Sequence, residues 1–87
     1  GFAKAQNNLG LMYKNGKGVE KDFKQALNWF RMAVQNGHAA ANSNVGRMYS
    51  DGQGVEQNFK EAVKLFEVAA KQGDHDAQYN LGLEYRL

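Results

Sequence analysis

The 87-residue sequence contains no cysteine, so the fold uses neither disulfides nor thiolate metal ligands. It also contains no apolar run near the roughly 18 residues that a membrane helix needs, which excludes insertion into a membrane. Neither charge sign forms a run, and 11 basic and 9 acidic residues give a net charge of only +2. Nucleic-acid binding is not expected, because it calls for a clustered basic stripe.

The sequence also lacks an initiating methionine and a secretory signal. It opens at Gly1, already inside the repeat described next, so we expect it to be a segment of a longer protein. The composition that remains, 43% hydrophobic and 23% charged residues, is ordinary for a soluble globular chain.

The chain repeats itself with a period of 36 residues. Between residues 1–36 and 37–72, 16 positions are identical without a gap, and residues 73–87 begin a third unit. Such a period is typical of stacked supersecondary units, which work through an extended surface rather than an enclosed pocket. We therefore treat residues 1–87 as one domain of two repeats and part of a third. The positions that keep their identity in all three units include Ala5, Asn8, Gly10 and Tyr13, with their equivalents.

Each unit predicts two helices. Apolar residues recur at helical spacing over residues 3–14, and Gly16 is suited to the left-handed conformation that ends a helix. Asp22 can then cap a second helix, as Asn58 can in the next unit, while Gly37 and Gly73 close these second helices. The second helices carry apolar stripes: Phe23, Ala26, Leu27, Phe30, Ala33 and Val34, then Phe59, Ala62, Val63, Phe66, Ala69 and Ala70.

Gly10 lies in the middle of a predicted helix, where glycine costs about 1 kcal/mol relative to alanine. Close approach of the paired helix is the expected compensation, with Ala26 and Ala33 facing the glycine and with Tyr13 and Phe30 on its flanks.

The loop Gly16-x-Gly18-Val19 recurs 36 residues later, and its paired glycines raise the question of a phosphate site. Phosphate-binding loops follow a strand and carry further glycines or a lysine at a set position, whereas a helix is predicted before this loop and it has only two glycines. A structural role is favoured, in which Val19 and Val55 fill the gap between the two helices of their own hairpins.

The motifs Asn8-Leu9-Gly10-x-Met12-Tyr13 and Gly16-x-Gly18-Val19, followed by Asp22, Ala26, Trp29-Phe30 and Ala33, resemble the Sel-one-like repeat (SLR) family. Tetratricopeptide repeats share the Leu-Gly-x-x-Tyr core, but they have a 34-residue period and a shorter turn. The resemblance spans the chain and implies an all-α fold: an α-solenoid of antiparallel helix pairs, about five helices here, wound into a right-handed superhelix. It also implies an adaptor that holds other proteins together. The residues of the chain themselves indicate neither catalysis nor a cofactor.

In such a superhelix the first helices line the concave side. Ala5, Leu9, Gly10, Met12 and Tyr13 are expected to be packed, which leaves the remaining positions of the first helices to face a partner. An asparagine ladder and neighbouring cations would suit an extended, acidic peptide, since carboxamides pair with peptide backbone. The alternative is that the asparagines bond neighbouring backbone and serve folding. The candidate binding residues are Asn8, Leu11, Lys14, Asn44, Arg47, Tyr79, Asn80, Leu83 and Arg86.

Catalysis and metal binding have little support. His38 and His75 occupy different places in the repeat, and the acidic residues beside His75 are explained by the dipole of a helix start. No third or fourth metal ligand follows at fitting spacing. Ser43 and Ser50 have no histidine and carboxylate arranged by sequence to activate them.

Two further possibilities stay open beside the adaptor. Disulfide-bearing relatives suggest a binder of glycans or cell-wall fragments, although this chain has no cysteine, and the chain could instead be a scaffold fragment without activity of its own. Phe2 and Ala5 at one end, and Leu81, Tyr85 and Leu87 at the other, form apolar faces without a capping unit. We therefore expect self-association through the ends.

Overall fold

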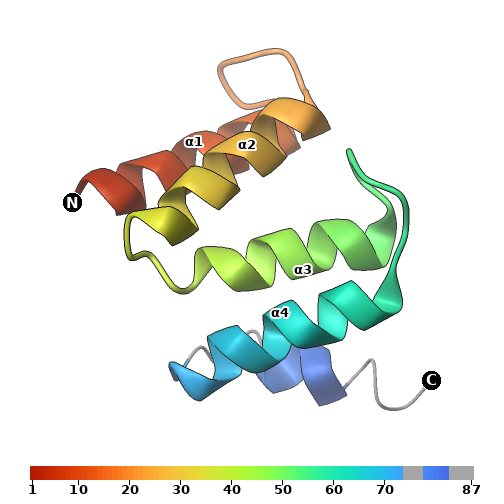
Figure 1. Ribbon diagram of the computed structural model, residues 1–87. Helices are drawn as coiled ribbons and strands as arrows, with labels where there is room; N and C mark the ends of the chain where they lie inside the picture. The colour runs from red at the N-terminus through yellow and green to blue at the C-terminus, as the bar shows by residue number, and fades with distance from the viewer. Residues whose placement is uncertain (74–77, 83–87) are drawn as a thin grey trace.

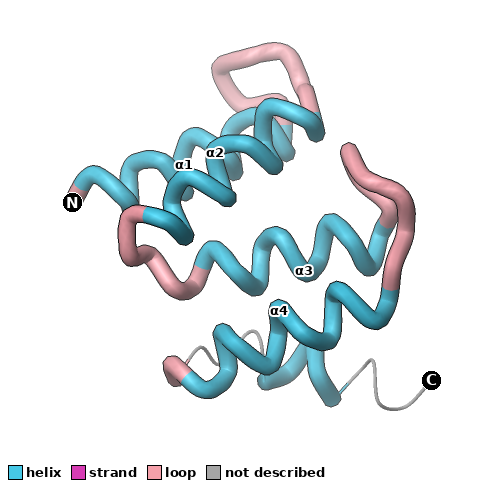
Figure 2. The backbone as a smooth tube through the Cα atoms, viewed as in Figure 1, coloured by secondary structure: helices cyan, strands magenta, loops and turns pink. Residues whose placement is uncertain are grey.

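The computed structural model describes residues 1–73 and 78–82. It contains the helices α1 (Phe2–Asn15), α2 (Phe23–Gln35), α3 (Ala41–Asp51) and α4 (Phe59–Lys71), and residues 78–82 form a further helical segment. The pairs α1–α2 and α3–α4 are antiparallel hairpins that stack on one another (Figure 1), and the described residues contain no strand (Figure 2). The predicted all-α solenoid of five helices is confirmed.

The helix ends follow the predicted local rules. Gly16 (φ 69°) and Gly52 (φ 68°) end α1 and α3 in the left-handed conformation. The side chains of Asp22 and Asn58 each accept a hydrogen bond of 3.1 Å from the backbone N–H three residues later, at the starts of α2 and α4. In both hairpins, therefore, a left-handed glycine ends the first helix and an Asp or Asn side chain caps the second.

The hydrophobic core joins the units rather than filling each hairpin separately. Its first cluster combines residues of α2 and α3, and its second cluster lies on α4, where Leu81 from the fifth helical segment packs against it. The buried members of the first cluster are Ala26, Leu27, Phe30, Val45 and Met48, and those of the second are Ala62, Phe66 and Ala69.

Gly10 and Gly46 allow the close approach that the sequence predicts, but the opposing group differs from the expectation. A Cβ added to Gly10 would lie 2.5 Å from Cδ1 and Cε1 of Phe30. A Cβ added to Gly46 would lie 2.8 Å from Cε1 of Phe66 and 3.2 Å from the carbonyl oxygen of Ala62. The expectation of Phe30 on the flank is wrong, because its ring lies directly over the glycine.

Two first-helix residues that were expected to be packed are exposed in the first unit. Ala5 is exposed and Met12 is 37% exposed, whereas their equivalents Ala41 and Met48 are fully buried. The difference arises because α3 packs against α2 of the preceding unit, and α1 has no described unit before it. Ala41 and Met48 are therefore buried by contact between units, and Ala5 and Met12 lack that contact.

The second loop also joins the units. Val55 packs against the first core cluster, and a Cβ on Gly54 would lie 2.9 Å from the carbonyl oxygen of Phe23. Val55 therefore packs against a cluster shared by α2 and α3, and Gly54 lies against the start of α2 in the preceding unit. Phe59, the equivalent of Phe23, belongs to the apolar stripe of α4 and is 47% exposed.

Candidate functional site

The first helices bring two cations from neighbouring units onto one face. Lys14 at the end of α1 is half-buried, and Arg47 of α3 is exposed. Burial lowers the pKa of the Lys14 ammonium, the positive charge of Arg47 lowers it further, and the carboxylate of Asp51 acts in the opposite direction. Lys14 and Arg47 are therefore close enough to repel one another, and Asp51 offsets only part of the effect.

The asparagines that are identical in sequence have different surroundings. Asn44 donates a hydrogen bond of 2.9 Å from Nδ2 to Oδ1 of Asn7, and this bond joins α3 to α1 across the unit boundary. Asn8 is exposed, and Asn80 is half-buried. Asn44 thus has a structural partner, while Asn8 is open to solvent.

The remaining predicted binding residues divide by exposure. Leu11 is partly buried and packs against the first core cluster, so only part of its side chain is accessible. Tyr79 is 69% exposed, whereas its equivalents in the first two units, Asn7 and Ser43, are buried. Leu83 and Arg86 lie outside the described residues.

A buried glutamine was missed by the sequence analysis. Gln6 is 1% exposed, and its Oε1 accepts a hydrogen bond of 2.8 Å from Nδ2 of Asn36 at the end of α2. Its Nε2 is buried without a partner in the described part of the chain. The signal was available, because Gln6, Asn42 and Gln78 place an amide at the same position in every unit.

In residues 1–73 and 78–82, no three histidine, cysteine or acidic side chains lie together as a metal site would require. His75 and the acidic residues beside it fall outside this part. Among the described helices, none combines the length and the apolar character that crossing a membrane requires.

Stacked antiparallel helix pairs with this period define a helical-repeat protein, a solenoid that presents side chains from successive units along one surface. The Sel1 repeat model matches residues 3–38, 39–74 and 75–87, and the chain belongs to this family. Sel1 repeats are related to tetratricopeptide repeats and generally act as protein-interaction scaffolds, typically by binding proteins. The family is typically not catalytic.

Solved structures show the same fold. A Sel1 repeat protein from Oxalobacter formigenes is 38% identical over 93% of this chain, with a TM-score of 0.87. The protective antigen c5321 of uropathogenic Escherichia coli, which displays an SLR fold, is 40% identical over 97%, with a TM-score of 0.89. The cysteine-rich protein B of Helicobacter pylori is 34% identical over 91%, with a TM-score of 0.80.

These structures are longer than this chain. The matched region is 33% of the Oxalobacter protein, 18% of the Escherichia coli antigen and 59% of the Helicobacter protein. No curated protein sequence matches the chain significantly.

Proposed function

We propose that this chain is a protein-interaction module that binds an extended, acidic segment of a partner protein along the face of its first helices. Asn8, Lys14 and Arg47 would contact the partner, with Tyr79 providing apolar area at the next unit. The asparagine carboxamides could pair with the partner's backbone, and the two cations could bind its carboxylates.

The observation that carries the proposal is the proximity of Lys14 and Arg47. The burial of Lys14, and then the positive charge of Arg47, lower the pKa of the Lys14 ammonium, so the charged form is held at a cost in the free chain. A partner carboxylate placed between them would remove that repulsion. Binding should therefore raise the pKa of Lys14 and weaken with added salt.

The test uses a fluorescein-labelled peptide of alternating Glu and Gly with an amidated C-terminus, and fluorescence anisotropy as the readout. Arg47→Glu is expected to weaken binding about three- to tenfold, the range for reversing a partly exposed charge. Lys60→Glu is the matched control, because it makes the same change in net charge at an exposed position of α4. The control should bind nearly as well as the parent chain.

Equal weakening by Arg47→Glu and Lys60→Glu would show that only net charge matters, and it would refute the proposed site. A thermal-shift experiment with cell-wall muropeptides addresses the glycan alternative. Stabilisation by muropeptides, with no response to the acidic peptide, would replace the adaptor function by a glycan-binding one.

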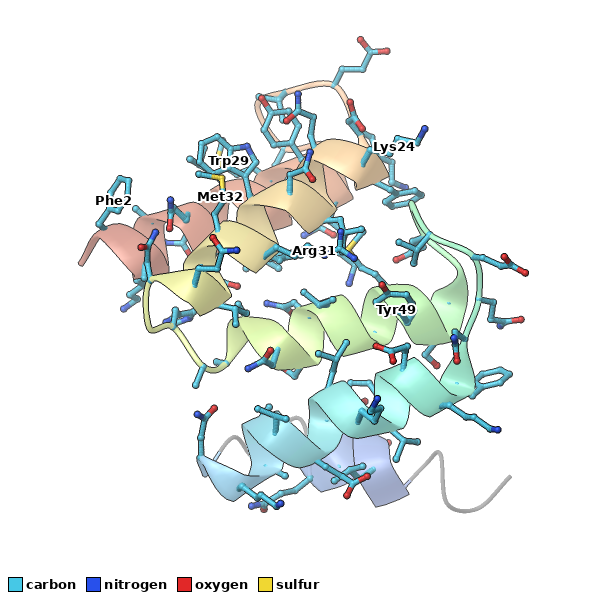
Figure 3. The ribbon with its side chains drawn as sticks, in the orientation of Figure 1. Phe2, Lys24, Trp29, Arg31, Met32 and Tyr49 are labelled. Atoms are coloured by element: carbon cyan, nitrogen blue, oxygen red, sulfur yellow. The ribbon has the colours of Figure 1, made fainter. Side chains whose placement is uncertain are left out.

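We also propose that copies of the chain associate through their ends. Phe2 is 73% exposed and Met32 is 41% exposed, and both lie in the same region as Trp29 (Figure 3). Leu65, the equivalent of Trp29, packs against the first core cluster, which joins α2 and α3, so the Trp29 position is suited to contact a neighbouring unit. Light scattering should show a mass that rises with concentration and falls in Met32→Lys. A constant monomer mass at high concentration would refute this proposal.

A further inference from the structure

A second concave feature lies on the side of the second helices. It is an open groove of about 300 Å³ between α2, α3 and α4, and it includes none of the candidate residues of the first-helix face. Val34, Val45 and Leu65 form its apolar part, while Arg31, Asn42 and Tyr49 provide its polar groups. The groove therefore combines apolar area with hydrogen-bonding groups, as binding sites for small groups do.

Asn42 is the first sign that this groove receives a ligand. Its side chain is 8% exposed and lines the groove, and it has no hydrogen-bond partner in the described part of the chain. The equivalent Gln6, which is longer by one methylene, reaches Asn36 and accepts a hydrogen bond from it. Within the described residues, the fully buried side-chain polar atoms without a partner are Nε2 of Gln6 and Oε1 of Gln53, so the amide of Asn42 keeps contact with solvent in the groove and is available to a ligand.

Arg31 is the second sign. Its Nη2 donates a hydrogen bond of 2.9 Å to the hydroxyl of Tyr49, and Figure 3 shows the two side chains pointing toward one another from α2 and α3. Arg31 forms no ion pair within the described residues, and Glu61 across the groove pairs with Lys64 at 3.6 Å. Tyr49 thus holds the guanidinium in place while its other N–H groups can bind a carboxylate.

We propose that the groove binds the C-terminal residue of a partner protein, an apolar residue with a free carboxylate. The carboxylate would bind Arg31, the apolar side chain would contact Val45 and Leu65, and the last peptide group would pair with Asn42. A C-terminal residue is favoured over an internal acidic one because it carries its carboxylate and its apolar side chain on the same carbon. The groove volume is at the lower end for ligand pockets, which suits a single residue.

The probe is the peptide acetyl-Gly-Gly-Leu with a free carboxylate, titrated into the chain and followed by NMR shifts and calorimetry. Shifts are expected at Val34, Val45 and Leu65. The same peptide with a C-terminal amide should bind about tenfold more weakly or worse, because it loses a charged hydrogen bond. Equal affinity for acid and amide, or no binding of the acid at millimolar concentration, would overturn the proposal.

Three variants separate this site from the first-helix face. Arg31→Gln should weaken binding of the acid peptide about tenfold, whereas Lys24→Gln, which removes another exposed cation of α2 outside the groove, should leave it unchanged. Arg47→Glu should also leave it unchanged. Weakening by Lys24→Gln or Arg47→Glu equal to that by Arg31→Gln would overturn the assignment.

Asn42→Ala distinguishes a ligand contact from a purely structural residue. It should weaken binding several-fold and leave the melting temperature unchanged or higher, because the amide makes no hydrogen bond in the free chain. A clear fall in melting temperature together with unchanged peptide affinity would assign Asn42 to the fold and contradict its role in binding.

Discussion

The close contact between Gly46 and Phe66 makes Gly46→Ala the sharpest test of how the helices pack. The added Cβ would lie 2.8 Å from Cε1 of Phe66, a distance at which one of the two groups must move. The ring of Phe66 is 1% exposed and has no open space to enter, and the carbonyl oxygen of Ala62 lies 3.2 Å from the same Cβ. Relief therefore requires α3 and α4 to separate.

Two opposing effects determine how much Gly46→Ala changes the free energy of unfolding. Replacing glycine by alanine inside a helix gains about 1 kcal/mol of helix propensity. Overpacking a well-packed core costs about 1–3 kcal/mol, and the buried ring and the backbone oxygen favour the upper half of that range. We expect a net loss of about 1–2 kcal/mol in the free energy of unfolding. For a chain of this size, each 1 kcal/mol lowers the melting temperature by about 4–8 °C.

Circular dichroism during thermal and urea denaturation measures this loss. Gly82→Ala is the matched control, because Gly82 occupies the same repeat position in a helical segment and a Cβ there meets none of the described residues within 4 Å. The control should be neutral or stabilising. Gly46→Leu, which adds three more carbon atoms, should leave the domain unfolded. If Gly46→Ala were as stable as Gly82→Ala, the account of the glycine would be wrong.

Three further predictions concern single interactions. Asn44→Ala removes the bond to Asn7 and should cost about 0.5–1.5 kcal/mol in urea denaturation, whereas exposed Asn8→Ala should stay within about 0.5 kcal/mol; equal losses would contradict the inter-unit bond. Asn58→Ala should lower the free energy of unfolding by about 1 kcal/mol, and Asn58→Asp should lower it much less, because Asp can also cap α4. An alanine variant as stable as the parent would contradict the capping role of Asn58. Lys14→Gln should raise the free energy of unfolding at neutral pH, because folding lowers the pKa of Lys14 and so disfavours its charged form. At pH values between the folded and unfolded pKa of Lys14, the unfolded chain binds more protons than the folded chain. The parent therefore gains stability as pH rises, and the difference in stability between Lys14→Gln and the parent shrinks. A difference that grew with pH would contradict this prediction.

The features that the sequence predicts best are those that depend on near neighbours. Gly16 ends its helix, and Asp22 caps the next by binding a backbone N–H three residues away. Both rules act within one helical turn and need no knowledge of how the units stack. The repeat period then extended the same assignment to Gly52 and Asn58.

The features that were missed join distant residues. Asn44 bonds Asn7 at a separation of 37 residues, and Arg31 bonds Tyr49 at a separation of 18. Such contacts depend on how far one hairpin is displaced against the next, which periodicity does not determine. The same limit explains Met12, since its expected burial requires a preceding unit to pack against it.

The candidate site was predictable in outline only. The repeat register placed Lys14 and Arg47 on one predicted face, because equivalent helices of a solenoid lie on the same side, and the charge of Arg47 acts on Lys14 in the structure. Register alone did not show that Leu11 is partly buried in the core. The groove was not predicted at all, because it is formed by three helices from two units.

The most direct test of the central claim is an NMR titration of the uniformly ¹⁵N-labelled chain with the amidated peptide of alternating Glu and Gly. Amide shifts report which face the peptide contacts, and the amidated end removes the carboxylate that the groove would bind. The account predicts the largest shifts around Asn8, Lys14, Asn44 and Arg47. Shifts centred on Arg31 and Tyr49, or no shifts at millimolar peptide and low salt, would contradict it.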